Sequence, residues 1–155
     1  MISELKTFLV AMSPIVELRG AIPLAYGVYK MSIWSAYFFS VAGNIVPLVG
    51  IVVLAKPISQ WLSYRFNIFK RLFDWLFLKI SKKTEKLGIF GKDLIVVVLT
   101  AIPVPFVGGW TGALASFILE IPAKRGIILV SLGAMISGII VSLLTLGIIN
   151  FISGA

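Results

Sequence analysis

Long apolar stretches alternate along this chain with breaks that are rich in proline, glycine and charge. Two stretches, 33–55 and 126–152, are continuous and can cross a membrane, because about 20 apolar residues span its hydrocarbon core. Two others, 4–26 and 94–119, are interrupted near their centres. The order of broken stretch, loop and continuous stretch occurs twice, which predicts two repeats whose breaks meet at a binding site.

The first broken stretch carries an ion pair and two prolines. Pro14, Glu17, Arg19, Gly20 and Pro23 all fall inside it. A straight spanning helix with these residues would be costly, since one Arg or Asp at a helix centre costs about 2.5 to 3.5 kcal/mol. We therefore predict a re-entrant hairpin that ends its first helix near residue 12, breaks at Pro14 and returns through Glu17 to residue 25.

The second broken stretch is interrupted by backbone rather than by charge. Pro103 and Pro105 stop an apolar run, and Gly108, Gly109 and Gly112 follow. This segment is too broken for a continuous helix and predicts a second re-entrant hairpin. Because one continuous span separates the hairpins, we expect them to enter from opposite faces and to meet near the midplane.

The segment 56–92 differs from the rest of the chain. It holds nine of the fourteen basic residues, and its apolar residues recur at three- and four-residue steps. This pattern predicts an amphipathic helix in the headgroup plane, on the cytoplasmic side by the positive-inside rule. Its charge either only sets the orientation or also recruits an anionic lipid.

Orientation follows from a second basic site, the Lys124–Arg125 turn. With two hairpins and two spans, this turn is cytoplasmic and both termini are outside. A model with four full spans would place the same turn outside and both termini inside. The positive-inside rule favours the hairpins.

Composition agrees with a membrane protein. The chain is 59% apolar with a mean hydropathy of +1.07, and it has no Cys and no His. We therefore expect no cofactor, no metal and no His-based catalysis, and without a visible nucleophile–base pair an enzyme is the least favoured class. The net charge of +8 lies outside the apolar stretches, which fits cytoplasmic loops and predicts no nucleic-acid partner.

The predicted fold is an all-α integral membrane protein with a single domain spanning 1–155. Repeat 1 covers 1–55, the amphipathic cytoplasmic linker covers 56–92, and repeat 2 covers 93–155. Each repeat is a re-entrant helical hairpin followed by a transmembrane helix, and the two repeats are inverted.

Glu17 and Arg19 are the only charges near the centre of a broken stretch, so they are the first functional candidates. In an irregular turn, both side chains can converge on one cavity. Three interpretations stay open: an ion pair that only orders the hairpin, a Glu17 that titrates and couples protons to transport, and an Arg19 that binds an anionic headgroup.

Other candidates have structural alternatives. Asn44, before Pro47, either contacts a ligand or makes a hydrogen bond between helices at a kink. The Gly108–Gly109 pair either exposes backbone N–H groups to a ligand or allows tight packing of the hairpins. Trp110 either gates a cavity or fills the core.

Three segments carry a resemblance to a known family: 17–25 (ELRGAIPLA), 43–44 (GN) and 100–115 (TAIPVPFVGGWTGALA). In these segments the chain resembles the small multidrug export protein family, over nearly its whole length. More remotely, the order of hairpins and spans resembles the DedA or VTT-domain superfamily, whose members are implicated in moving phospholipids or polyprenyl-phosphate carriers.

The DedA resemblance implies a membrane-buried acidic residue in the first hairpin, which Glu17 matches. It also implies arginines around the second hairpin turn, where this chain has only Thr100 and Thr111. Anion binding would then rest on Arg19. The complete set of candidate site residues is Glu17, Arg19, Gly20, Pro23, Asn44, Thr100, Pro103, Pro105, Gly108, Gly109, Trp110 and Thr111.

These observations predict a small multi-pass transporter in the plasma membrane of a prokaryote. The expected cargo is an amphipathic lipid-phosphate molecule, moved by alternating access with Glu17 as a proton-coupling carboxylate. The alternatives are an exporter of lipophilic cations and a non-transporting scaffold or lipid sensor. Membrane lipids are expected partners, and a homodimer is expected because two spans per chain shield buried charges poorly.

Overall fold

The protein is all-α, as predicted. The computed structural model describes residues 2–104 and 107–152, and the only β-type pairing in them is an isolated bridge between Val104 and Val107. The helices in chain order are α1 (Ile2–Ala11), α2 (Glu17–Pro23), the π-helical turn η1 (Leu24–Val28), α3 (Ile33–Arg65), α4 (Asn67–Thr84), the 3-10 turn η2 (Glu85–Leu87), α5 (Gly88–Ala101), α6 (Gly109–Ile118) and α7 (Ala123–Ile152).

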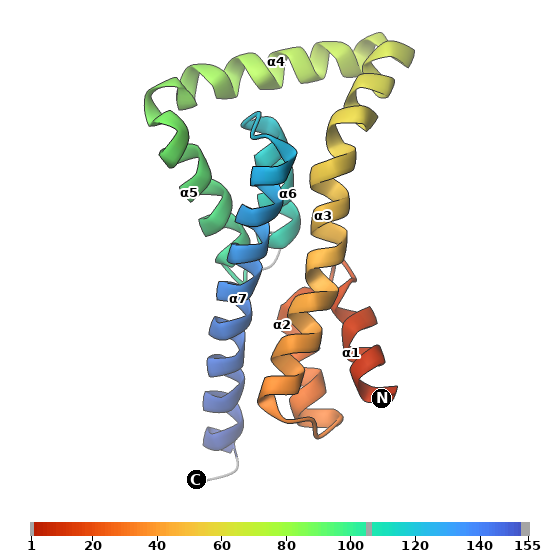
Figure 1. Cartoon of the computed structure of the whole chain (residues 1–155), viewed down its shortest axis with the longest axis vertical. Coiled ribbons are helices and arrows are strands. Elements are labelled where there is room, and N and C mark those ends of the chain that lie inside the picture. The colour runs from red at the N-terminus through yellow and green to blue at the C-terminus, as the bar shows by residue number, and fades with distance from the viewer. Residues whose placement is uncertain (1, 105–106, 153–155) are drawn as a thin grey trace.

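Two long helices form the frame of the molecule. Figure 1 shows α3 and α7 running along its length, with α1 and α2 beside them at one end and α5 and α6 at the other. Helix α4 lies across the end that α5 and α6 occupy. Helix α1 begins and α7 ends at the opposite end of the molecule.

Both long helices are long and apolar enough to cross a membrane. Only 33% of the most apolar stretch of α3 and 39% of that of α7 is buried inside the protein. The remaining apolar side chains therefore face outward, as expected for helices in contact with lipid. At the start of α3, Ser32 caps the helix as expected, because its Oγ accepts a hydrogen bond from the backbone N–H of Ser35 at 3.2 Å.

The predicted amphipathic helix was too long at both ends. Helix α3 continues to Arg65, and the chain bends at Phe66, whose backbone is extended (φ −137°). The amphipathic helix α4 covers only residues 67–84, and residues 88–92 belong to α5. The three- and four-residue spacing of apolar positions continues across Phe66, so the pattern could not reveal a bend made by one residue.

Each short helix pair reverses at the predicted break. Pro14 lies between α1 and α2, where a proline cannot donate a helical hydrogen bond and disfavours helix in the residue before it. Between α5 and α6, Ile102 leaves the helix in an extended conformation, and α6 restarts after Gly108.

The helices pack in a crossed arrangement. Helix α1 packs on α3 and α5 packs on α7, whereas α2 also packs on α7 and α6 on α3. In each half, the long helix makes one close contact with the first short helix through a glycine. A methyl group at Gly43 would collide with the Phe8 carbonyl, and one at Gly133 would lie 2.9 Å from the Val97 oxygen.

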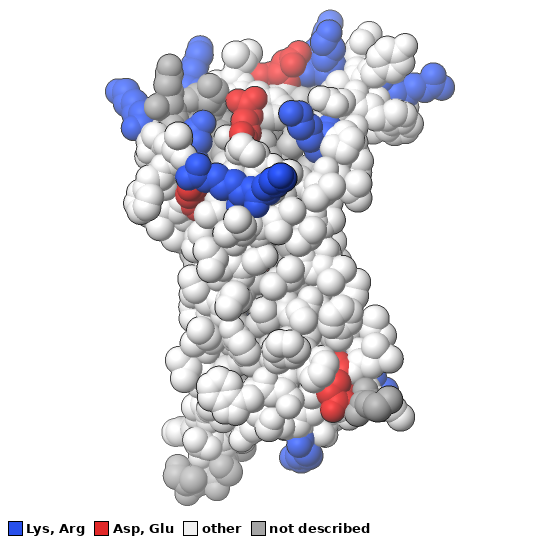
Figure 2. Space-filling model, viewed as in Figure 1, with Lys and Arg blue, Asp and Glu red and all other residues white. Residues whose placement is uncertain are grey.

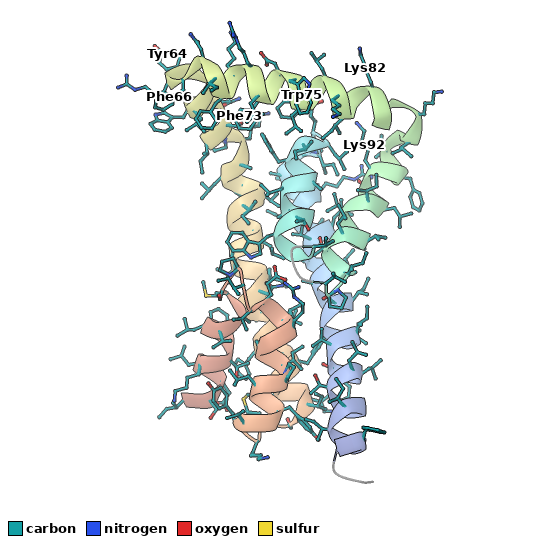
Figure 3. The ribbon with its side chains drawn as sticks, turned by 180° about the vertical axis from the view of Figure 1, so that it is seen from behind. Tyr64, Phe66, Phe73, Trp75, Lys82 and Lys92 are labelled. Atoms are coloured by element: carbon teal, nitrogen blue, oxygen red, sulfur yellow. The ribbon has the colours of Figure 1, made fainter. Side chains whose placement is uncertain are left out.

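The α4 end carries most of the charge. Figure 2 shows Lys and Arg side chains gathered there, whereas the central part of the same face is free of charged side chains. An ion pair joins α5 to α7 at this end, where Arg125 Nε donates to Asp93 Oδ2 at 2.9 Å. In Figure 3, Phe73 points from α4 toward the bundle, and Lys82 lies on the outer side.

Candidate functional site

A cavity of about 450 Å³ lies where the two breaks meet. One wall is the turn between α1 and α2, and the other is the start of α6. We call it the central cavity; the residues that line it are Pro14, Ile15, Val16, Glu17, Arg19, Gly20, Val107, Gly108, Trp110 and Thr111.

Glu17 is the buried acid of this cavity. It starts α2 in a left-handed backbone conformation (φ 48°), which is uncommon outside glycine, and the residue is only 5% exposed. Its Oε2 accepts a hydrogen bond from Arg19 Nη2 at 3.3 Å. The irregular backbone therefore brings together two side chains that would point to opposite sides of a regular helix.

The carboxylate of Glu17 also faces the start of α6. The backbone N–H groups of Gly109 and Trp110 lie within hydrogen-bonding reach of it. The first N–H groups of a helix lack partners within the helix, and the positive end of the helix dipole favours an anion there. A side chain of the first half of the chain thus faces the start of a helix of the second half.

Gly108 is needed for this contact. A Cβ atom at this position would lie 2.9 Å from Glu17 Oε2. Thr111 makes two hydrogen bonds to Gly108 in the same turn. Its Oγ1 accepts one from the Gly108 N–H and donates one to the Gly108 carbonyl, both at 2.9 Å. Thr111 therefore fixes the turn that holds Gly108 against the carboxylate.

Hydrogen-bond donors remain available in the cavity. The side chain of Arg19 is 20% exposed, and its hydrogen bond to Glu17 uses a single N–H of the five that a guanidinium carries. The Nε1 atom of Trp110 is buried and has no hydrogen-bond partner among the described residues. Because the hydrogen bond to Glu17 leaves other N–H groups of the Arg19 guanidinium available, the cavity is suited to a ligand that accepts hydrogen bonds.

Asn44 lies behind this site rather than in the cavity lining. It is 2% exposed on α3, and its Oδ1 has no partner within the described part of the chain. A Cβ at Gly109 would lie 3.4 Å from Asn44 Nδ2 and 2.8 Å from a methyl group of Leu48. Asn44 and Leu48 therefore hold the start of α6 tightly against α3.

Besides Asn44, three of the predicted site residues lie away from the cavity, and Gly109 is not among the residues that line it. Thr100 is 2% exposed, donates to the Val96 carbonyl at 2.8 Å and packs against Gly112 and Gly133, as a residue of the helix packing would. Pro23 ends α2, one turn from Arg19, and Pro103 lies in the loop before α6; neither lines the cavity. Pro105 lies outside the described residues.

Sequence reasoning missed the apolar residues of the cavity. Ile15, Val16 and Val107 line it, and Ile15 is 85% exposed. Their position inside the two breaks was the available signal, but an apolar residue in an apolar stretch has no feature that marks it. No group of three or more acidic, His or Cys side chains that could hold a metal occurs in the part of the chain that the structure describes.

Comparison with known proteins identifies the family. Residues 17–140 match the family described as "Putative small multi-drug export protein". The chain belongs to this family. Its description is that of an exporter, which is a membrane transporter and not an enzyme. No curated protein and no solved structure matches the chain.

Proposed function

We propose that this small multidrug export family member moves an amphipathic molecule with a phosphate headgroup across the membrane by alternating access. One observation carries the proposal: the central cavity offers the partly exposed Arg19 guanidinium to a ligand. Phosphate oxygens accept hydrogen bonds from a guanidinium, which can hold two of them at once.

Helix packing supports an inverted repeat. Residues that correspond across the halves are 90 positions apart, as Gly43 and Gly133 are. Lys30 and Glu120 are also 90 apart, each has a positive φ (54° and 56°), and each stands three residues before its long helix. Since a positive φ is uncommon for such residues, the same turn in both places argues for one repeated unit.

The crossed packing gives alternating access a structural basis. The first helix of each hairpin packs on the long helix of its own repeat, and the second packs on the long helices of both repeats. Rocking one repeat against the other would therefore change the contacts of α2 and α6 together, around a cavity that both of them line.

Glu17 is suited to couple this movement to protons. Its carboxylate joins α2 to the N–H groups at the start of α6. Protonation would remove the negative charge that favours this position and would weaken the contact between the two hairpins. We propose that the protonated form allows the hairpins to separate.

The geometry favours a phosphate headgroup over a lipophilic cation. A cation would need a free carboxylate, but Glu17 already interacts with Arg19 and with two backbone N–H groups. A cation in this cavity would also lie beside the Arg19 guanidinium, and like charges repel.

A homodimer stays a prediction. Glu17 is buried within a single chain, so shielding of this carboxylate does not by itself require a second copy. Two residues of the cavity lining are partly or largely exposed: Arg19, whose side chain is 20% exposed, and Ile15. Lipid or a second chain would cover them.

Arg19 variants test the cargo class. A short-chain polyprenyl phosphate and a lipophilic cation are each titrated against the wild type, Arg19→Lys and Arg19→Ala. For the phosphate we expect about tenfold weaker binding or more, with Ala weaker than Lys, because a charge-assisted contact contributes roughly 1.5 to 3 kcal/mol.

Cation binding should hold or improve in both Arg19 variants, since a repulsive charge is lost. Lys92→Ala is a control at the α4 end that removes a basic residue outside the cavity lining. Unchanged phosphate affinity in folded Arg19 variants would rule out this reading of the cavity.

A further inference from the structure

A second cavity lies at the α4 end, and the proposed function does not account for it. Its volume is about 560 Å³, and it shares no lining residue with the central cavity. We call it the α4-end cavity. The end of α3, helix α4 and the turn between α6 and α7 enclose it, with Val52, Lys56, Gln60, Phe77, Phe117 and Glu120 among its walls.

Opposite charges face this cavity without pairing. Lys56 comes from α3 and Glu120 from the turn after α6, and both line the same space. The ion pairs found among the described residues are Glu17–Arg19 and Asp93–Arg125, so neither Lys56 nor Glu120 is bound to a partner charge. Two separated, accessible charges of opposite sign fit a ligand that carries both signs.

The backbone holds Glu120 in position at some cost. Its φ of 56° is left-handed, which is costly for a residue other than glycine. Hydrogen bonds from the N–H of Glu120 to the Phe117 carbonyl and from the N–H of Ile121 to the Ser116 carbonyl, both at 3.0 Å, fix the turn. The backbone of Glu120, which lines the cavity, is therefore fixed by this turn.

The inner wall is aromatic. The rings of Phe77 on α4 and Phe117 on α6 pack edge to face, with their centroids 5.4 Å apart. Next to them, Val52 and Ile121 extend the apolar surface into the bundle. The cavity thus combines two charged side chains with an aromatic and apolar wall, which suits a lipid near its headgroup.

We propose that the α4-end cavity binds the headgroup of a zwitterionic aminophospholipid, with its phosphate at Lys56 and its ammonium at Glu120. The glycerol region and the first methylene groups lie against Phe77 and Phe117. The binding itself is independent of transport. We also assign the α4-end cavity a role in access, as the site from which cargo reaches the central cavity. This role rests on the proposed function.

The repeat relation supports this role in access. A smaller cavity of about 250 Å³ lies at the opposite end of the molecule and is lined by Lys30 and Ile149. These residues are each 90 positions from Glu120 and Ser59 of the α4-end cavity. The two cavities therefore occupy corresponding places in the two repeats, and the one at the α4 end is the wider.

Short-chain lipids provide the test. Dioctanoyl phosphatidylethanolamine and dioctanoyl phosphatidylglycerol are titrated by calorimetry into the full chain in detergent, for the wild type, Lys56→Gln and Glu120→Gln. Lys70→Gln and Asp74→Asn are matched controls, because Lys70 and Asp74 are exposed on α4 and do not line the cavity.

We expect Lys56→Gln to weaken the binding of the ethanolamine lipid about tenfold or more, because a charge-assisted contact is lost. Glu120→Gln should weaken the binding of the ethanolamine lipid but not that of the glycerol lipid. The preference of the protein for the ethanolamine lipid should therefore fall. Both control variants should bind like the wild type. Each variant is checked for an unchanged elution volume and thermal transition.

The same titrations are repeated with Arg19→Gln, in which the central cavity has lost its cation. Ethanolamine-lipid binding that survives Arg19→Gln and is lost with Lys56→Gln supports the α4-end site, even if transport assays disprove the proposed function. If the Lys56 and Glu120 variants bind both lipids like the wild type, or if phosphoethanolamine without acyl chains competes as well as the lipid, the proposal is wrong.

Discussion

Glu17 combines three unusual properties in one residue. It is buried, it has a positive φ, and its carboxylate meets an arginine of its own hairpin and the start of a helix from the other half. Strain of this kind costs about 1 to 3 kcal/mol and persists only where the surroundings enforce it. This combination favours a functional role over one of only ordering the hairpin.

Glu17→Gln tests proton coupling. The substitution keeps the size of the side chain and its ability to accept from the α6 N–H groups, but removes the titratable charge. We expect gradient-driven transport to be lost and the protein to stay folded, as measured by flux in proteoliposomes and by circular dichroism. Wild-type transport by this variant across a pH series would exclude coupling through Glu17.

Gly108→Ala tests the contact between the two hairpins. The new Cβ would lie 2.9 Å from Glu17 Oε2, so the carboxylate must move away from the start of α6. We expect reduced transport and a lower thermal transition, because overpacking typically costs about 1 to 3 kcal/mol.

A second substitution serves as the control for Gly108→Ala. Adding Glu17→Asp shortens the acidic side chain by one methylene group and makes room for the new methyl group. The double variant should regain part of the lost stability. If Gly108→Ala alone behaves like the wild type, the close approach of Gly108 to Glu17 is not needed.

At the residue scale, charge was the informative signal in the sequence. Glu17 and Arg19 could be singled out because a charge in an apolar stretch is costly. The pairing of Glu17 with α6 could not be predicted, because it depends on the packing of two segments about 90 residues apart. Thr100 was predicted as a site residue because it is polar and belongs to a family motif. In the structure it packs between glycines of two helices instead.

At the scale of elements, glycine sets how closely helices approach. Gly112 on α6 meets the Thr100 side chain of α5, and Gly133 on α7 meets the same residue from the other side. Such contacts drive association of membrane helices, where close packing replaces the hydrophobic effect. The sequence showed the small residues, but their partners depend on which helix faces which.

Gly112→Ala measures this packing. No room exists for a methyl group beside Thr100, so we expect destabilisation by about 1 to 3 kcal/mol in a thermal or denaturant melt. Gly50→Ala is the matched control, because nothing lies within 4 Å of a Cβ at that position of α3. The control should equal or exceed the wild type, since alanine favours helix. Equal loss in both variants would contradict the packing role.

Element boundaries show where the sequence pattern is limited. Proline and glycine marked the breaks between α1 and α2 and between α5 and α6, because each acts on the local backbone. The bend between α3 and α4 has no such marker, and Pro57 lies inside α3 rather than at its end. A proline is therefore a reliable sign of a break only where its neighbours also disfavour helix.

At the scale of the whole molecule, charge and shape agree on an orientation. Helix α4 and the start of α7, which carries Lys124 and Arg125, lie at one end, and α1 begins and α7 ends at the other. With α4 on the cytoplasmic side by the positive-inside rule, both ends of the chain face outward. The structure shows that α4 and the two ends of the chain lie at opposite ends of the molecule. Which of these ends faces the cytoplasm stays a prediction.

Cysteine labelling decides the orientation, and the chain has no native cysteine to interfere. Ser3→Cys probes the start of α1, and Lys82→Cys probes the exposed outer side of α4. In intact cells, a membrane-impermeant thiol reagent should label Ser3→Cys and should reach Lys82→Cys only after lysis. The physical reason is the excess of basic residues around α4, which holds that end in the cytoplasm. Both variants must be labelled fully in detergent, which shows that neither thiol is hidden by the fold. Labelling of Lys82→Cys in intact cells, with Ser3→Cys protected until lysis, would invert the protein and place the wider α4-end cavity on the outer face.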